Sequence, residues 1–257
     1  MRLLFSECAP DYAAYLAPYQ VWGVLDSEET PAVAFGQGFL PGAYDLSHFY
    51  LARSGRIRLD LYTPPARVRY AARRCADLSP ALTPATEFAF DTSWRALAAG
   101  YLSGRWSGSA FDLDRFTRLL RSPLTTHVLT LVSTADAVPA GLAALYLEGD
   151  VGYYAAAVYD LSRRRSGIGG HLTATALSEF QRAGCGLAYL GTCYSTGALY
   201  KTRFPGLEFF NGHRWSSDRD ELRFLIDHQS QLVGTHLLEF GPYRETYLRP
   251  AATAADR

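Results

Sequence analysis

The sequence predicts an α+β protein in which a mixed β-sheet is flanked by helices and preceded by a smaller β-rich N-terminal module. Its 257 residues, 48% of them hydrophobic and 19% charged, can fill one large core or two small ones and exclude a disordered chain. In the second part of the chain, three strand-like runs precede alternating helix and strand patterns. This order is typical of an antiparallel meander that continues through a right-handed crossover.

The first part of the chain, residues 1–80, is expected to form the smaller module. Strand-like runs with turn residues between them occupy residues 21–25, 32–36, 47–53 and 56–62. We expect the last two runs to form a hairpin that turns through Ser54 and Gly55. A short basic helix is expected at 67–76, and the Pro-, Thr- and Ser-rich run at 77–86 predicts the boundary between the two parts.

The second part, residues 81–257, is expected to hold the mixed sheet. Helical spacing of large apolar residues, strand-like alternation and Gly-rich turns place its elements. The expected order is helices at 92–101 and 112–120, strands at 127–133, 141–148 and 152–159, a polar loop at 160–170, a helix at 171–183, a strand at 187–190, a helix at 196–203 and a strand at 207–210. The residues after Trp215 predict no particular element.

Charge is balanced overall but unevenly distributed. The 25 basic and 25 acidic residues cancel, which argues against nonspecific nucleic-acid binding as the only role. The first fifty residues hold one arginine and six acids, whereas the next stretch is strongly basic. Its cations are Arg53, Arg56, Arg58, Arg67, Arg69, Arg73 and Arg74. This cluster is a candidate contact surface for a polyanion.

The sequence also indicates the compartment. No apolar run approaches the about 18 residues that a membrane span needs, and Glu7 interrupts the N-terminal apolar run before a signal peptide could form. The four cysteines, Cys8, Cys75, Cys185 and Cys193, form no Cys-x-x-Cys pair. We therefore expect a cytoplasmic protein with reduced thiols, no membrane contact and no thiolate metal site.

A glycine-containing loop is the first candidate site. Residues 164–169, Arg-Arg-Ser-Gly-Ile-Gly, resemble the (Arg/Gln)-x-x-Gly-x-(Gly/Ala) loop of the Gcn5-related N-acyltransferases. Glycines before a helix let backbone N–H groups approach a pyrophosphate, and the helix dipole favours the anion. The resemblance implies an acyl-CoA site; a structural helix entrance or another anionic ligand remain open.

A longer resemblance covers nearly the whole chain. Residues 200–208, Tyr-Lys-Thr-Arg-Phe-Pro-Gly-Leu-Glu, resemble the Tyr-Lys-x-Arg-Phe-x-Pro-Leu-Glu signature of the arginyl- and leucyl-tRNA-protein transferases. Weaker matches occur elsewhere in the chain, in the same order as in the family, at Cys8, Tyr15-Leu16, 36–39, 67–78, 101–105, 116–123 and 212–215. Members of this family have a Gcn5-like domain after a smaller module. Both resemblances therefore imply the same fold, and they differ only in the donor, which is an acyl-CoA in one case and an aminoacyl-tRNA in the other.

Two departures from the family's pattern matter. Where the family carries a Cys-x-x-Cys associated with an iron-sulfur or metal centre, this chain has Ile57–Tyr62, so we expect no metal. The family's Lys-Met before the Tyr-Lys is also missing, because residues 192–199 contain neither residue type. That segment should lie near the donor's aminoacyl group, which leaves room for a changed donor or acceptor within the same reaction.

The family resemblance implies that an acceptor amine attacks the ester of an aminoacyl-tRNA and expels the terminal ribose hydroxyl, with charged tRNA as co-substrate and no cofactor. An α-amine has a pKa of about 7.7 to 8.0, so its deprotonation at neutral pH costs only about 1 kcal/mol. A general base contributes about 10² to 10⁴, whereas positioning can contribute roughly 7 to 11 kcal/mol. We therefore expect positioning to dominate, with no side chain acting as a nucleophile.

The candidate site residues follow from that reaction. Glu208 would orient the amine or accept its proton, and Tyr154 and Tyr194 would hydrogen-bond the carbonyl or relay protons. Substrate binding is assigned to Tyr153, Tyr200, Lys201 and Arg203, the last two toward acceptor-stem phosphates or the terminal adenosine. The tRNA backbone would contact Arg67, Arg69, Arg73, Arg74 and Arg164. Core packing, ion pairing or a solvated helix face is the structural alternative for each.

The sequence leaves several functions open. The expected amino acid is Arg or Leu, and the acceptor is either a protein N-terminus or a small molecule such as an antibiotic precursor. The alternatives are an acetyl-CoA-dependent N-acetyltransferase and a noncatalytic tRNA-binding regulator. Serine hydrolases, zinc peptidases and P-loop enzymes are excluded, because Gly-x-Ser-x-Gly, His-Glu-x-x-His and Walker motifs are missing from the sequence.

Overall fold

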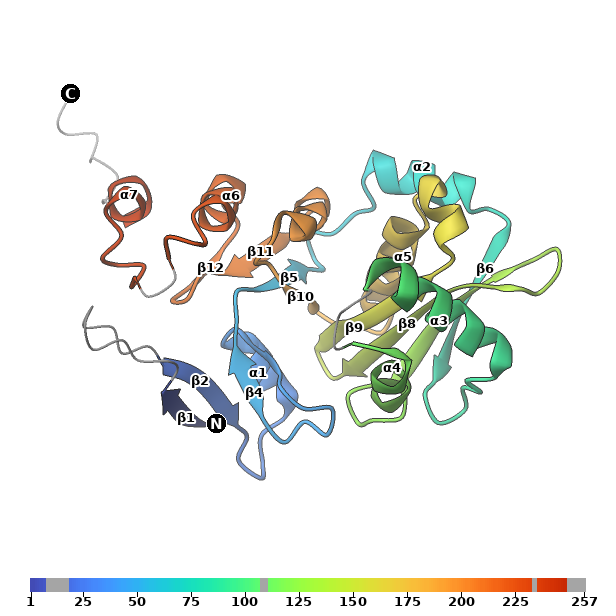
Figure 1. The fold of residues 1–257 in the computed structure, drawn as a ribbon, viewed down its shortest axis with the longest axis horizontal. Coiled ribbons are helices and arrows are strands. Elements are labelled where there is room, and N and C mark those ends of the chain that lie inside the picture. The colour runs from blue at the N-terminus through green and yellow to red at the C-terminus, as the bar shows by residue number, and fades with distance from the viewer. Residues whose placement is uncertain (8–18, 107–110, 233–234, 249–257) are drawn as a thin grey trace.

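The computed structural model describes residues 1–7, 19–106, 111–232 and 235–248. Two β-sheets with helices around them make up this part of the chain (Figure 1). The smaller sheet comes from the N-terminal residues, and the larger sheet has helices on both faces. The predicted fold class, a mixed sheet flanked by helices and preceded by a smaller N-terminal sheet, is confirmed.

The smaller sheet has the strand order β1-β2-β4-β3 and one short helix, α1. Its elements are β1 (Arg2–Glu7), β2 (Tyr19–Val24), α1 (Pro31–Gly36), β3 (Phe39–Pro41) and β4 (Phe49–Leu51). The prediction of a strand at 32–36 was wrong. Thr30 is extended and Pro31 opens α1, which is the position that proline favours in a helix, and α1 buries Ala34 and Phe35.

The larger sheet has the order β12-β11-β5-β10-β9-β8-β7-β6. Its strands are β5 (Ser54–Arg58), β6 (Leu78–Pro84), β7 (His127–Ser133), β8 (Pro139–Glu148), β9 (Val151–Tyr159), β10 (Leu187–Thr192), β11 (Leu207–Phe210) and β12 (Trp215–Ser216). The meander β7-β8-β9 and the parallel pair β9-β10 confirm the predicted order. All other described neighbours in this sheet are antiparallel.

The N-terminal part of the chain contributes two strands to the larger sheet. The prediction of a hairpin through Ser54 and Gly55 was wrong, because both residues lie inside β5, which pairs with β10 and β11 and not with β4. The expected boundary at residue 80 falls within β6. The smaller sheet ends at Leu51, and every described strand after that residue belongs to the larger sheet.

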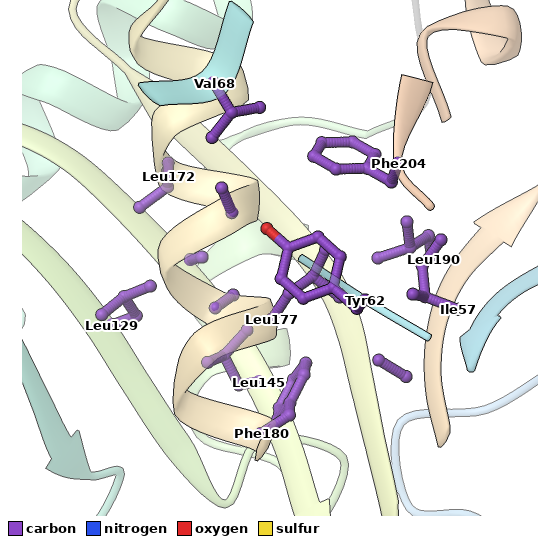
Figure 2. Close-up of a cluster of buried hydrophobic side chains, with 14 of the residues drawn as sticks. Ile57, Tyr62, Val68, Leu129, Leu145, Leu172, Leu177, Phe180, Leu190 and Phe204 are labelled. Atoms are coloured by element: carbon purple, nitrogen blue, oxygen red, sulfur yellow. The ribbon is translucent and has the colours of Figure 1, made fainter. Parts of the chain in front are cut away.

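Helices cover both faces of the larger sheet (Figure 1). On one face lie α2 (Ala66–Arg74) and α5 (Ile168–Arg182), and on the other lie α3 (Thr92–Arg105) and α4 (Leu113–Leu120). Figure 2 shows the core between α5 and the sheet, with Ile57, Tyr62, Val68, Leu129, Leu145, Leu172, Leu177, Phe180, Leu190 and Phe204 labelled. Burial of these side chains fixes the position of α5 over the sheet.

Asp91 and Asp112 begin the helices α3 and α4, because their carboxylates accept hydrogen bonds from the backbone N–H groups of the first turn. The polar loop predicted at 160–170 contains a 3₁₀ helix, η1 (Leu161–Ser166), that Asp160 caps. Gly167 ends η1 with a φ of 85°, a left-handed conformation that favours glycine, and α5 begins at the next residue.

The C-terminal residues fold onto the edge of the larger sheet. A 3₁₀ helix, η2 (Thr196–Arg203), lies between β10 and β11 at the predicted helix position, and α6 (Arg219–Asp227), α7 (Gly241–Tyr243) and a π-helical turn, η3 (Arg244–Leu248), follow β12. Their contact centres on the fully buried carboxylate of Glu221. It accepts hydrogen bonds from Asn211, Tyr243 and Ser216. No described helix is long and apolar enough to cross a membrane.

Candidate active site

The central strands of the larger sheet separate at the point where two β-bulges face each other. β9 and β10 pair only as far as Tyr153 and Tyr189. Beyond that point Ala155 is an extra residue in β9 relative to β8. β10 has its own bulge after Tyr189, where Gly191 adopts a φ of 77°. Because bulges bend and twist strands, β9 and β10 diverge and leave the inner edge of β9 open.

A cavity of about 940 Å³ lies where the two strands diverge. Its walls include residues of β9, β10, η2, α2, α3 and the first turn of α5. Val68 and Phe204 line it and connect it to the core in Figure 2. The volume lies at the upper end of the range of small-molecule sites. The cavity can therefore accept a ligand as large as an aminoacyl nucleoside.

The cavity carries positive charge. The arginines Arg67, Arg105 and Arg203 line it, as does the buried amine of Lys201, and among the described residues of its wall there is no Asp or Glu. These cations come from α2, the end of α3 and η2, so they approach the cavity from different elements. Cations unbalanced by carboxylates favour an anionic or electron-rich ligand.

Tyrosines supply most of the polar groups on the strand side of the cavity. Tyr153 and Tyr154 on β9 line it together with Tyr200 on η2. Burial raises the pKa of Tyr153 and of Tyr154, and raises that of Tyr200 to about 12. At neutral pH these hydroxyls are protonated, so they can donate hydrogen bonds to a ligand carbonyl but cannot act as bases.

Two further cavity residues were not among the predicted site residues. Tyr101 and Arg105 lie one helical turn apart on α3 and both line the cavity, and the ring of Tyr101 lies 4.7 Å from that of Tyr159 on β9. Burial raises the pKa of Tyr101 to about 12. The i, i+4 spacing of the two residues could have indicated a shared face, but nothing in the sequence shows which face meets β9.

The glycine loop borders the cavity, with α2 packed against it. Gly167, Gly169 and Gly170 line the cavity at the N-terminus of α5. A Cβ at Gly167 would lie 3.0 Å from the Cβ of Ala71 on α2, whereas one at Gly170 would meet nothing within 4 Å. The loop is therefore closed on the α2 side and open toward the cavity at Gly170.

Lys201 and Arg203 differ in accessibility although both lie on η2. Lys201 is only 5% exposed, and its Nζ donates a hydrogen bond to the carbonyl oxygen of Thr192 at 2.6 Å. Arg203 is exposed at the cavity. A polynucleotide on the surface can reach Arg203, whereas Lys201 can contact only a group that enters the cavity.

The structure places two predicted catalytic residues away from the cavity wall. Glu208 on β11 is held by Arg56 of β5 at 2.7 Å, and the Arg56 guanidinium lies 3.8 Å from the ring centre of Trp215. Tyr194 accepts a hydrogen bond from the backbone N–H of Arg53 through its hydroxyl, at 2.9 Å. Both side chains are engaged by other residues of the fold, and neither is among the cavity-lining residues.

The predicted tRNA-contacting arginines are exposed, and only one of them enters the cavity. Arg67, Arg69, Arg73 and Arg74 all lie on α2, and Arg67 alone lines the cavity. Arg69 donates a hydrogen bond to the carbonyl of Pro64. Arg73 and Arg74 both lie 5.8 Å from the ring centre of exposed Tyr70. Arg164 is exposed on η1.

Some predictions fall outside the residues that the structure describes. Cys8, Tyr15 and Leu16, which the N-terminal part of the family resemblance used, lie in the segment 8–18. Cys75, Cys185 and Cys193 are buried free thiols. Within the described ranges, no group of three or more His, Cys, Asp and Glu side chains is arranged to hold a metal ion.

Comparison with known proteins gives distant structural likenesses only. No family model matches the chain, and no curated protein sequence matches it. Among solved structures, the C-terminal domain of a putative lysylphosphatidylglycerol synthetase from Agrobacterium fabrum is similar, with 12% identity, 83% of this chain and 85% of that chain covered, and a TM-score of 0.46.

Two further structures match at a similar level. L-PGS from Bacillus licheniformis has 13% identity, with 88% of this chain and 75% of that chain covered and a TM-score of 0.47. FemX has 10% identity, with 82% and 72% covered and a TM-score of 0.42. Likenesses this distant assign the chain to no family.

Proposed function

We propose that this protein is an aminoacyl-tRNA-dependent transferase that moves an amino acid from charged tRNA to an acceptor amine. Arginine and leucine are the proposed amino acids, as the sequence resemblance implies. The acceptor is a protein N-terminus or a small molecule such as an antibiotic precursor. Charged tRNA is the co-substrate, and the reaction uses no cofactor, because the ester is already activated.

The observation that carries the proposal is the continuity between the cavity and the basic face of α2. One helix supplies Arg67 to the cavity and presents Arg73, Arg74 and Tyr70 to solvent. A long polyanion that inserts one end into a pocket needs cations both outside and inside its mouth. A charged tRNA is such a ligand, since its 3′ end carries the reactive ester and its stem carries the phosphates.

Within the cavity the tyrosine hydroxyls can stabilise the transition state. Attack by an amine puts negative charge on the ester carbonyl oxygen, and a protonated phenol can donate a hydrogen bond to that oxygen. Tyr154 is the best placed of these, because it precedes the β9 bulge and lines the cavity. Glu208 is engaged by Arg56, so the proposal assigns it the indirect role of fixing β11 against β5.

A second candidate function is acetyl transfer from acetyl-CoA. It is favoured by Gly169 and Gly170, which present the N-terminus of α5 to the cavity, an arrangement that binds phosphate well. The packing of Ala71 against Gly167 closes part of the loop and weighs against this candidate. A noncatalytic tRNA-binding regulator remains the third candidate, distinguished by binding without turnover.

The test is a transfer assay with tRNAs that each carry one labelled amino acid, beginning with arginine and leucine, and a panel of protein and small-molecule amines. We expect label in an amide product, lost when the tRNA is treated with ribonuclease beforehand. In parallel, acetyl-CoA is tested for a rise in melting temperature. Acetylation by acetyl-CoA without any transfer from tRNA would overturn the proposal in favour of the second candidate.

Paired variants give the assay an internal control. Tyr154→Phe removes a cavity hydroxyl and is expected to lower the transfer rate at least tenfold, about 1.4 kcal/mol in the barrier. Tyr62→Phe removes a buried hydroxyl that has no hydrogen-bond partner and does not line the cavity, so it should leave the rate unchanged. Equal effects from the two variants would contradict the assignment of the site.

A further inference from the structure

Lys201 is the only lysine in the sequence, and the fold buries its amine in the wall of the candidate active site. It is one of three buried residues of η2, with Ala198 and Thr202. The amine and the Thr192 carbonyl that accepts its hydrogen bond both belong to cavity-lining residues. An ammonium group has three N–H donors, and in the described part of the chain only one of them has a partner.

No negative charge compensates this amine. None of the ion pairs among the described residues includes Lys201. The titratable group that faces it is Cys193, with the guanidinium of Arg53 nearby. Burial raises the pKa of the Cys193 thiol, so that thiol is neutral at physiological pH. Burial without a counter-charge in turn lowers the pKa of Lys201.

We propose that Lys201 carries the proton that the transfer reaction must move, and that it accepts this proton in its neutral form. This role rests on the proposed function. As the acceptor nitrogen attacks the ester carbon, a C–N bond forms and Nζ takes a proton from that nitrogen. As the C–O bond to the terminal ribose breaks, Nζ returns the proton to the ribose oxygen. The products are an amide and a free hydroxyl, and Lys201 is again neutral.

The location of the residue separates this role from phosphate binding. A lysine that binds a nucleic-acid backbone is charged and solvent-accessible, as Arg203 is on the same helix. Lys201 is 5% exposed and hydrogen-bonded to a backbone carbonyl. An arginine could not replace it in proton transfer, because a guanidinium is not deprotonated in proteins.

The first experiment measures the charge state directly. Labelling with [¹⁵N]lysine gives a single side-chain signal in the intact protein, since there is one lysine, and the Nζ shift is followed by NMR against pH. A free lysine titrates at about 10.4. We expect the midpoint of Lys201 below about 9; a midpoint at or above that value overturns the inference, whatever the activity of the protein.

The second experiment separates a proton carrier from a fixed cation. Lys201→Arg keeps the charge, and Lys201→Met keeps the length without a titratable group. Both variants are expected to lose on the order of 10² in the single-turnover transfer rate, with the affinity for charged tRNA within about threefold of wild type. Retention of the rate by Lys201→Arg overturns the shuttle, because it shows that a permanent cation suffices.

The outcomes distinguish failure of the proton-carrier role from failure of the proposed transferase function. If wild-type protein transfers no amino acid from any tRNA, the proposed function fails and the shuttle fails with it. If wild-type protein transfers and the titration midpoint is high, only the shuttle fails. Thermal melting of both variants confirms that they are folded, and the titration of wild-type protein keeps the inference falsifiable if they are not.

Discussion

The basic face of α2 makes a quantitative prediction about salt. Arg73 and Arg74 are exposed, take part in no described ion pair and lie near the ring of Tyr70. If each contacts one phosphate of tRNA, the double variant Arg73→Gln/Arg74→Gln loses two phosphate contacts. Each contact contributes roughly 0.7 to 0.9 to the slope of log affinity against log salt. The slope should therefore become shallower by about 1.4 to 1.8.

This change is measurable over an ordinary range of salt. Between roughly 50 and 200 mM salt, the affinity of wild-type protein should fall about tenfold more than that of the variant. The assay is fluorescence anisotropy of end-labelled tRNA at four or five salt concentrations. Melting temperatures of both proteins confirm that the variant is folded, as expected for two exposed side chains.

A matched variant controls for net charge. Arg219→Gln/Arg223→Gln removes two exposed arginines from α6, which lies far from α2 in Figure 1. It should leave the slope unchanged. An unchanged slope in the α2 variant, or the same reduction in both variants, would show that the charges of α2 do not contact the RNA.

Three further predictions concern stability. Glu221→Ala removes the carboxylate that accepts hydrogen bonds from Asn211, Ser216 and Tyr243. It should lower the free energy of unfolding, measured in urea, by about 3 kcal/mol, whereas a loss below about 1 kcal/mol would contradict the network. Gly152→Ala places a Cβ 2.5 Å from the Phe180 ring and should cost about 1–3 kcal/mol, while Gly100→Ala, with nothing within 4 Å, should cost nothing. Lys201→Met should raise stability by about 1–3 kcal/mol at neutral pH. Between the lowered pKa of Lys201 and about 10.4, the unfolded wild-type chain binds more protons than the folded one, so wild-type stability rises with pH. The difference in stability between the variant and wild type should therefore shrink over this range. A difference that does not change with pH would contradict a buried amine.

The sequence correctly predicted those elements of the fold that short-range sequence patterns determine. The meander and the crossover helix follow from alternation, helical period and glycine turns, and β7 and β11 match their predicted bounds. The wrong strand at 32–36 had a local signal as well, because Pro31 after Thr30 is typical of a helix start. No local signal in the sequence indicated which strands pair with β5. Its pairing with β10 and β11 joins segments more than a hundred residues apart in the chain, which no short pattern encodes.

The candidate site was predictable to the same extent. Tyr153, Tyr154, Tyr200, Lys201 and Arg203 meet at the cavity because short-range patterns placed their strand and helix correctly. The position of Glu208 depends on cross-strand register, which sets it opposite Arg56. The burial of Lys201 depends on packing around η2. Residue type and spacing show neither of these, so the roles assigned from the motif alone needed the structure.

The N-terminal part of the chain is a component of the candidate site and not a separate module beside it. β5 fills the place between β10 and β11, so without it both strands would expose unpaired backbone groups inside the sheet. Arg67, Val68 and Ala71 of α2 line the cavity, as do Leu40 and Tyr50 of the smaller sheet. The chain that precedes the meander therefore supplies the charge outside the cavity mouth, part of the cavity wall and the strand between β10 and β11, so the cavity and the basic face of α2 belong to one folded unit.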